Sequence, residues 1–168
     1  MTAWSRCVRL VARPAVGRRW YKFLLFGLLM GGNQAHAYCW AEVGSQFDIE
    51  PELLQAIAAV ESGYRADAIN LANRNGTRDI GLMQINSIHL PRLSQLGITE
   101  ERLLAEPCLS VEVGASILAE FIQRFGYNWT AIGAYNAGSG AGPEREALRM
   151  QYAQKIWARY EELVSQRY

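Results

Sequence analysis

Residues 1–37 hold six basic residues and no acidic one, and they divide into three parts. A basic run over residues 18–22 is followed by an apolar stretch over residues 23–32 and by Ala35-His36-Ala37. This order is typical of a secretory signal peptide, and an apolar stretch of about ten residues is too short to cross a bilayer as a helix. We expect a cleaved signal peptide over residues 1–37 and one folded domain over residues 38–168 in the periplasm. An uncleaved membrane anchor is the alternative.

The charge of the chain is unevenly distributed. The 168 residues carry 17 basic and 16 acidic side chains, so the part after residue 37 is net acidic once six of the basic ones are set aside. A hydrophobic content of 50% excludes a disordered protein, and the length suits about one domain. The acidic balance, with no lysine or arginine cluster, argues against nucleic acid as a partner.

Two cysteines remain after the expected cleavage, Cys39 and Cys108. An even number of cysteines in an exported protein indicates a disulfide, and two free buried thiols are the alternative. Two cysteines and His89 offer too few ligands at this spacing for a metal site, so we expect no metal. We assign His89 no catalytic role.

The pattern of apolar, capping and helix-breaking residues predicts a mainly α-helical fold with a minimal β element. Asn75-Gly76 is a strong turn pair and predicts a small hairpin within residues 64–86. Thr99, Ser110 and Asn128 are suitable N-caps. The expected helices cover residues 39–47, 51–62, a short segment between Thr99 and Pro107, 111–125, 129–137 and 144–164.

Glu61 is a carboxylate on the apolar face of its helix. At about 100° per residue it falls beside Ile57 and Leu54. A carboxyl group among apolar side chains loses hydration, so its pKa rises and it can donate a proton near neutral pH. The alternative is a glutamate at a helix end that bends into solvent or pairs with Arg65.

Two further stretches mix amides, apolar side chains and an aromatic ring next to glycine. They are residues 81–86, Gly-Leu-Met-Gln-Ile-Asn, and residues 134–138, Ala-Tyr-Asn-Ala-Gly. Amides can bond sugar hydroxyl and N-acetyl groups, and an aromatic ring offers a flat face to a pyranose. Each stretch alone could equally be a turn in a protein core.

Glu61-Ser62, Gly81-Leu-Met-Gln84 and Ala134-Tyr-Asn-Ala-Gly138 occur in an order and at a spacing that resemble the soluble lytic transglycosylase family, which has a lysozyme-like fold. The resemblance covers nearly all of residues 38–168. It is closest to the specialised IagB/IpgF-type transglycosylases that accompany type III secretion systems, through Cys39-Trp40, Glu106-Pro107-Cys108 and Lys155-Ile-Trp157.

The resemblance implies an activity without a cofactor. Such an enzyme cleaves the β-1,4 bond between N-acetylmuramic acid (MurNAc) and N-acetylglucosamine (GlcNAc) in peptidoglycan and leaves 1,6-anhydro-MurNAc ends. It also implies local opening of the cell wall, with components of an envelope-spanning secretion or pilus system as partners. Glu61 matches the single catalytic acid and base. The implied substrate-binding residues are Ser62, Met83, Gln84, Tyr135, Asn136 and Tyr152.

Asp79 is a candidate second carboxylate. Lysozyme pairs a buried glutamate with an aspartate on a nearby segment, and Asp79 precedes the Gly81-Leu-Met-Gln84 stretch. We hypothesise that Asp79 faces the cleft and assists the positive centre; the alternative is a turn cap or a partner of Arg78 or Arg74. The rival functions are a lysozyme-type hydrolase and a non-catalytic peptidoglycan-binding assembly factor, which would be expected to lack the acid.

Overall fold

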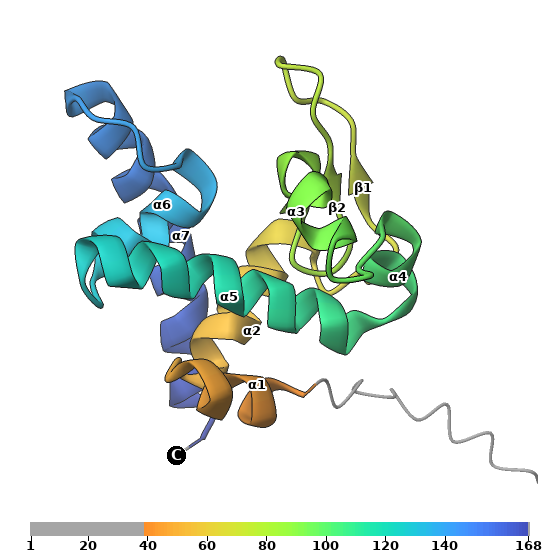
Figure 1. Cartoon of the computed structure of the whole chain (residues 1–168). Coiled ribbons are helices and arrows are strands. Elements are labelled where there is room, and N and C mark those ends of the chain that lie inside the picture. Colours follow the sequence, from red (N-terminus) through yellow and green to blue (C-terminus); the bar gives the residue numbers. More distant parts are fainter. Residues whose placement is uncertain (1–38, 168) are drawn as a thin grey trace, which may run out of the picture. The chain divides into compact units, whose positions relative to one another are not determined.

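Residues 39–167, the part of the chain that the computed structural model describes, form helices packed beside one small sheet (Figure 1). The predicted signal peptide lies outside these described residues. The predicted mainly α, lysozyme-like fold with a small β element is confirmed. The elements are α1 Trp40–Phe47, α2 Pro51–Ser62, β1 Ile69–Asn70, β2 Asp79–Ile80, β3 Ile85–Asn86, the 3-10 helix η1 Ser87–His89, α3 Leu90–Ser94, α4 Glu100–Ala105, α5 Pro107–Phe125, α6 Trp129–Ala137 and α7 Pro143–Ser165.

Local capping explains most helix boundaries. Helix α2 begins with Pro51 in its first turn and ends at Gly63, which adopts the left-handed conformation. The Thr99 side chain accepts a bond from the backbone N–H of Arg102 and caps α4. The Asn128 side chain caps α6 in the same way. Each of these two caps joins residues three positions apart, so both caps can be predicted from the local sequence.

Ser110 is not the cap of α5, contrary to the prediction. The helix begins at Pro107, because proline suits the first turn, where its missing N–H costs no hydrogen bond. Ser110 lies one turn inside, has no exposed surface, and accepts a bond of 3.2 Å from the backbone N–H of Met83. Residues 87–94 form η1 and α3, where no helix is expected from the sequence.

The three strands form an antiparallel sheet in the order β1-β2-β3. In this register Asn70 lies opposite Asp79, and Asp79 lies opposite Asn86. Residues directly opposite each other in a sheet project to the same face. The short sheet therefore gathers two amides around one carboxylate.

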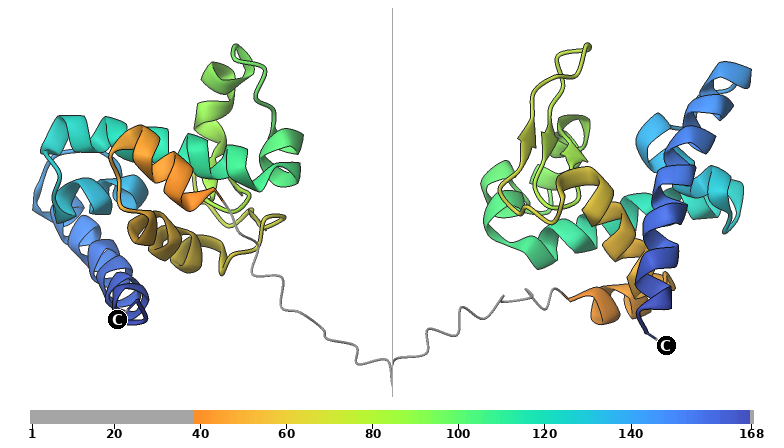
Figure 2. Two further views of the ribbon diagram at one scale, coloured as in Figure 1. Left: turned by 90° about the horizontal axis from the view of Figure 1, so that it is seen from below. Right: turned by 180° about the vertical axis from the view of Figure 1, so that it is seen from behind.

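Helix α5 runs between two parts of the fold. Figure 1 shows the sheet with α3 and α4 at one end of α5 and α6 with α7 at its other end, and the reverse view in Figure 2 agrees. Helices α6 and α7 approach closely at Gly133, where a Cβ atom would lie 2.3 Å from the backbone oxygen of Arg149. Glycine at this position brings α7 against α6 and close to the end of α2.

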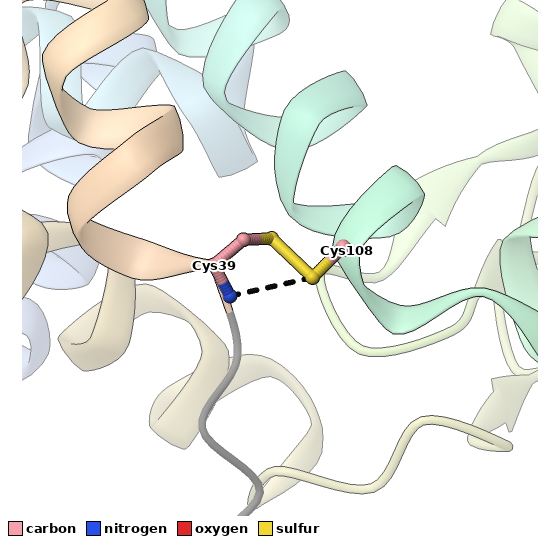
Figure 3. The surroundings of a disulfide bond; sticks show 2 residues. All are labelled: Cys39 and Cys108. Atoms are coloured by element: carbon pink, nitrogen blue, oxygen red, sulfur yellow. Dashed lines mark hydrogen bonds between the residues drawn. A yellow bond between two sulfur atoms is a disulfide. The ribbon is translucent and has the colours of Figure 1, made fainter.

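A disulfide joins the start of α1 to α5, which confirms the pairing of Cys39 with Cys108 (Figure 3). Their Cα atoms are 5.7 Å apart, and the Cys39 backbone N–H donates to the Cys108 sulfur at 3.3 Å. The bridge closes a loop of 69 positions, for which chain-entropy arguments give about 4 kcal/mol of stabilisation. Within residues 39–167, no helix is both long and apolar enough to span a bilayer.

Candidate active site

A cleft of about 730 Å³ separates the sheet from α6 and α7. Its walls come from the β1–β2 hairpin and the β2–β3 turn on one side and from α6 and α7 on the other, with contributions from the end of α2 and from α5. The lining side chains include both predicted carboxylates: Glu61, Asn73, Arg74, Asn75, Thr77, Asp79, Gln84, Ile85, Asn86, His89, Ile117, Tyr135, Asn136, Arg145 and Leu148.

Glu61 occupies the last turn of α2, where the helix reaches the cleft. The pKa of its carboxyl is raised to about 7, mainly by burial and also by the nearby charge of Asp79. A hydrogen bond from the Tyr152 hydroxyl, 2.6 Å from Oε1, and the charge of Lys155 oppose this rise. Arg65 does not pair with Glu61, because its Nε donates to the Ser62 carbonyl. Near neutral pH the carboxyl group can therefore both give and take a proton.

Two tyrosines, the buried Tyr152 and the partly buried Tyr135, support this end of the cleft. Tyr152 of α7 bonds Glu61, and the Tyr135 hydroxyl of α6 donates to the Met83 carbonyl at 2.9 Å. Burial raises the pKa of both phenols well above the usual value, so both remain protonated donors at neutral pH. Tyr135 lines the cleft itself, whereas Tyr152 lines a smaller recess next to it.

The structure does not place Met83 and Ser62 as substrate contacts. The Met83 side chain has no exposed surface and packs on Gly114, where an added Cβ would lie 2.9 Å from it. Only its backbone carbonyl serves the site, as the acceptor for Tyr135. The buried Ser62 hydroxyl donates to the Leu82 carbonyl at 2.7 Å and fastens the end of α2 to the β2–β3 turn. Both residues therefore position other parts of the site through contacts within the protein.

Gln84 and Asn136 line the cleft as predicted from the resemblance. The Gln84 backbone is left-handed, with φ of 49°, and its side-chain amide donates to the carbonyls of Gly81 and Ala68. These bonds stabilise the turn between β2 and β3. Asn136 is exposed at the end of α6 and borders both the cleft and the smaller recess.

Asp79 lies in the cleft wall within a set of three amide donors. Asn86 donates to Oδ1 at 2.7 Å, and Asn70 and Asn73 donate to Oδ2 at 3.1 and 3.0 Å. These three bonds fix the position of the Asp79 side chain in the cleft wall. Asp79 pairs with neither arginine considered above: Arg78 pairs with Glu100, and no ion pair of Arg74 occurs among the described residues.

Other features of the site were not predicted from the sequence. The strand register brings the amides of Asn70 and Asn86 to Asp79, and Asn73 joins them from the loop after β1. Leu148 of α7 is an apolar side chain that is 49% exposed and lines the cleft. His89 also lines it, and burial next to Arg92 lowers the pKa of its imidazole, so it is neutral at pH 7. In residues 39–167 no group of three or more metal-ligating side chains is found.

Comparisons with known proteins agree with this geometry. A model of the family described as Transglycosylase SLT domain matches residues 38–159. Invasion protein IagB of Salmonella typhimurium is 49% identical over 143 residues, 85% of this chain and 88% of that protein. Protein IpgF of Shigella flexneri is 42% identical over 139 residues, 83% of this chain and 90% of that one.

The fold also matches a solved structure. An inactive mutant of the lytic transglycosylase Slt from Pseudomonas aeruginosa superposes with a TM-score of 0.59 and 20% sequence identity. The match covers 79% of this chain and 25% of that larger chain. At this level of identity the likeness concerns the fold.

Proposed function

Because the chain belongs to the Transglycosylase SLT domain family and is a lytic transglycosylase, we propose that it cleaves the MurNAc-β-1,4-GlcNAc bond of peptidoglycan and leaves 1,6-anhydro-MurNAc ends. The observation that carries this proposal is the Glu61 carboxyl, which lies in the cleft with a pKa of about 7 and a bond from Tyr152. A group with that pKa can act first as an acid and then as a base.

The first step is protonation of the leaving group. Protonated Glu61 gives its proton to the glycosidic oxygen, and the bond from this oxygen to C1 of the muramyl sugar breaks. GlcNAc leaves with a free 4-hydroxyl group. The substrate's own N-acetyl oxygen stabilises the positive charge at C1, as in other substrate-assisted glycosidases. Burial supplies the acidic form, because it disfavours the carboxylate.

The second step closes the anhydro ring. Glu61, now a carboxylate that accepts the Tyr152 bond, takes the proton of the muramyl 6-hydroxyl group. The 6-oxygen bonds to C1, and Glu61 returns to its protonated form. Water does not enter the product. Tyr152 thus stabilises the form of Glu61 that exists between the two steps.

Asp79 favours a second candidate function. A fixed carboxylate in the same cleft could stabilise the positive centre, and with water as the nucleophile the reaction would be that of a lysozyme-type hydrolase. We include Asp79 in the proposed catalytic machinery as the group that assists the positive centre. The two functions differ in the product: 1,6-anhydro ends or reducing ends.

Digestion of purified peptidoglycan, with mass spectrometry of the products, tests the proposal. We expect 1,6-anhydro-MurNAc ends from the wild-type chain and no turnover by Glu61→Gln, which keeps the size and the acceptor for Tyr152 but cannot donate a proton. Circular dichroism confirms that the variant is folded, and Glu101→Gln, at an exposed position of α4, serves as a matched control. Reducing ends would identify a hydrolase, and turnover by Glu61→Gln would remove Glu61 from the mechanism.

We also propose that the enzyme acts in the periplasm and opens the wall locally for a secretion or pilus apparatus. The leader-like pattern of residues 1–37 and the Cys39–Cys108 disulfide support an oxidising compartment. Similarity to a protein named for invasion supports the apparatus. Cell fractionation with N-terminal sequencing tests the location: a mature chain that begins at residue 38 in the periplasmic fraction is the expected result.

A further inference from the structure

A second recess of about 230 Å³ lies next to Glu61. It shares Glu61, Asn136 and Leu148 with the main cleft, so it is the continuation of the cleft past the proposed acid. Unlike the main cleft, it has no contribution from the strands. Its walls come from the end of α2, the end of α6 and one face of α7: Val60, Glu61, Asn136, Leu148, Gln151, Tyr152 and Lys155.

Lys155 supplies the positive charge of this recess. It lies on α7 three positions after Tyr152, so the two side chains share a helix face. It is the only lysine in residues 39–167, it is exposed, and among the described residues it forms no ion pair. The ammonium group is therefore available to a ligand, although it is close enough to Glu61 to lower the pKa of that carboxyl.

The charge of the recess depends on Glu61. When Glu61 is protonated, as the first catalytic step requires, Lys155 is the single formal charge among the lining residues. The remaining polar groups there, Asn136, Gln151 and Tyr152, are neutral. An anion entering the recess would meet one cation and amide donors, which is a favourable environment for a carboxylate.

We propose that this recess binds a carboxylate of the glycan substrate, with Lys155 as its counter-ion and the Asn136 and Gln151 amides as neutral donors. The inference rests on the proposed function, because the muramyl sugar is the acidic component of that glycan. Its lactyl group has a free carboxylate where no peptide is attached, and attached stem peptides carry carboxylates of their own. A bound carboxylate would also offset the charge of Lys155 and so favour protonated Glu61.

Binding to the full chain carrying Glu61→Gln, which should not consume the ligand, provides the test. The probes are peptide-free muramyl glycan, the same glycan with its lactyl carboxylates converted to carboxamides, and peptide-bearing glycan. We expect the carboxylate form to bind about tenfold more tightly than the carboxamide form, as for a hydrogen bond to a charged group. Lys155→Gln should remove this difference and leave carboxamide binding within twofold.

Two further variants separate the ammonium charge from general effects. Lys155→Arg should retain the preference for the carboxylate. Arg124→Gln removes an exposed charge outside the cleft and the recess, and it should not alter this preference either. In a chain labelled with ¹³C-lysine, the signal that is absent from Lys155→Arg should shift on adding the carboxylate glycan and remain in place on adding the carboxamide. If the affinity for peptide-free glycan depends on Lys155, the bound group is the lactyl carboxylate. If only the affinity for peptide-bearing glycan depends on Lys155, the bound group is a carboxylate of the peptide.

The outcomes distinguish this inference from the proposed function. One contrary result is that Lys155→Gln lowers the affinity for the carboxylate glycan and the carboxamide glycan equally, and another is that it leaves the preference for the carboxylate unchanged. Either result would overturn the role of Lys155, although glycan binding itself would stand. Absence of binding to every glycan, together with absence of products from the wild-type chain, would overturn both. Anhydro products from the wild type with no effect of Lys155 would leave the reaction established and the carboxylate site refuted.

Discussion

The Tyr152 hydroxyl donates a hydrogen bond of 2.6 Å to Oε1 of Glu61, across 91 positions of sequence. The bond favours the charged carboxylate, whereas burial favours the neutral acid, and burial is the stronger of the two. Their balance leaves the pKa of Glu61 at about 7 rather than 4.5. A carboxyl group poised in this way changes its proton state at little cost, which suits a single residue with two roles.

The first prediction concerns the pH dependence of activity. Because protonated Glu61 starts the reaction, kcat/KM should fall as pH rises through about 7. Tyr152→Phe removes the bond that lowers this pKa, so the fall should move to higher pH, by about 0.5–1 unit. Tyr160→Phe on the same helix is the control and should leave the profile in place. A Tyr152→Phe profile that is unchanged, or moved to lower pH, would contradict this account of the bond.

The second prediction concerns Asp79. Asp79→Asn removes a negative charge that raises the pKa of Glu61 and that assists the positive centre in the proposed mechanism. We expect kcat to fall by about tenfold or more. The fall of kcat/KM at alkaline pH should also move to lower pH, because the pKa of Glu61 decreases. Asp67→Asn, an exposed position outside the cleft, is the matched control. Activity of Asp79→Asn within twofold of the wild type would end the hypothesis that Asp79 takes part in catalysis.

The third prediction concerns stability. The folded-state pKa of Glu61 lies above its unfolded value of 4.5, so ionising Glu61 disfavours the folded state increasingly as pH rises from about 4.5 to 7. Glu61→Gln carries no such penalty. The variant should gain on the order of 2–3 kcal/mol in free energy of unfolding near pH 8 and almost nothing near pH 4. Urea denaturation at both pH values measures this, and an equal gain at both would disprove the electrostatic origin.

The fourth prediction tests the assignment of Ser62 as a positioning residue. Ser62→Ala leaves the buried Leu82 carbonyl without this donor, at a cost of about 1–3 kcal/mol in free energy of unfolding. It also loosens the end of α2, so kcat should fall while KM changes little. Ser45→Ala, at an exposed position of α1, is the control. A rise in KM with unchanged kcat would instead indicate a direct contact of Ser62 with substrate.

The fifth prediction concerns the disulfide. Replacing Cys39 and Cys108 together by alanine should lower the free energy of unfolding by about 4 kcal/mol, since the unfolded chain regains the freedom of a loop of 69 positions. Both positions lie outside the cleft lining, so kcat of the folded variant should stay within about twofold of wild type. Thermal unfolding with and without reductant gives the same comparison in the wild-type chain. A reductant effect on the double variant would point to a cause other than the bridge.

Much of the fold could be predicted because its signals are local. Pro51 and Gly63 bound α2, and the caps Thr99 and Asn128 satisfy N–H groups within their own helices. Ser110 failed as a predicted cap because its hydroxyl serves a distant N–H, that of Met83, instead of its own helix. A residue suited to capping can form a tertiary bond equally well, and local sequence does not distinguish the two uses.

The candidate site was predictable to the extent that its residue types are unusual for their positions. Glu61 stood out as a carboxyl on an apolar helix face, and its raised pKa follows from that position. The amides around Asp79 did not stand out, because asparagine is common in loops and only strand register brings Asn70 and Asn86 to the carboxylate. Met83 lay within the right motif, yet its side chain serves the core while its carbonyl serves the site.

The contact at Gly133 has a consequence for when the enzyme becomes competent. Helix α7, which carries Tyr152 to Glu61, packs on α6 through this glycine. During synthesis, a ribosome-bound chain that has emerged as far as the strands already holds both acidic groups, yet the tyrosine that tunes one of them is still missing. Catalytic activity should therefore appear only late in folding, once α7 has packed against the rest of the domain.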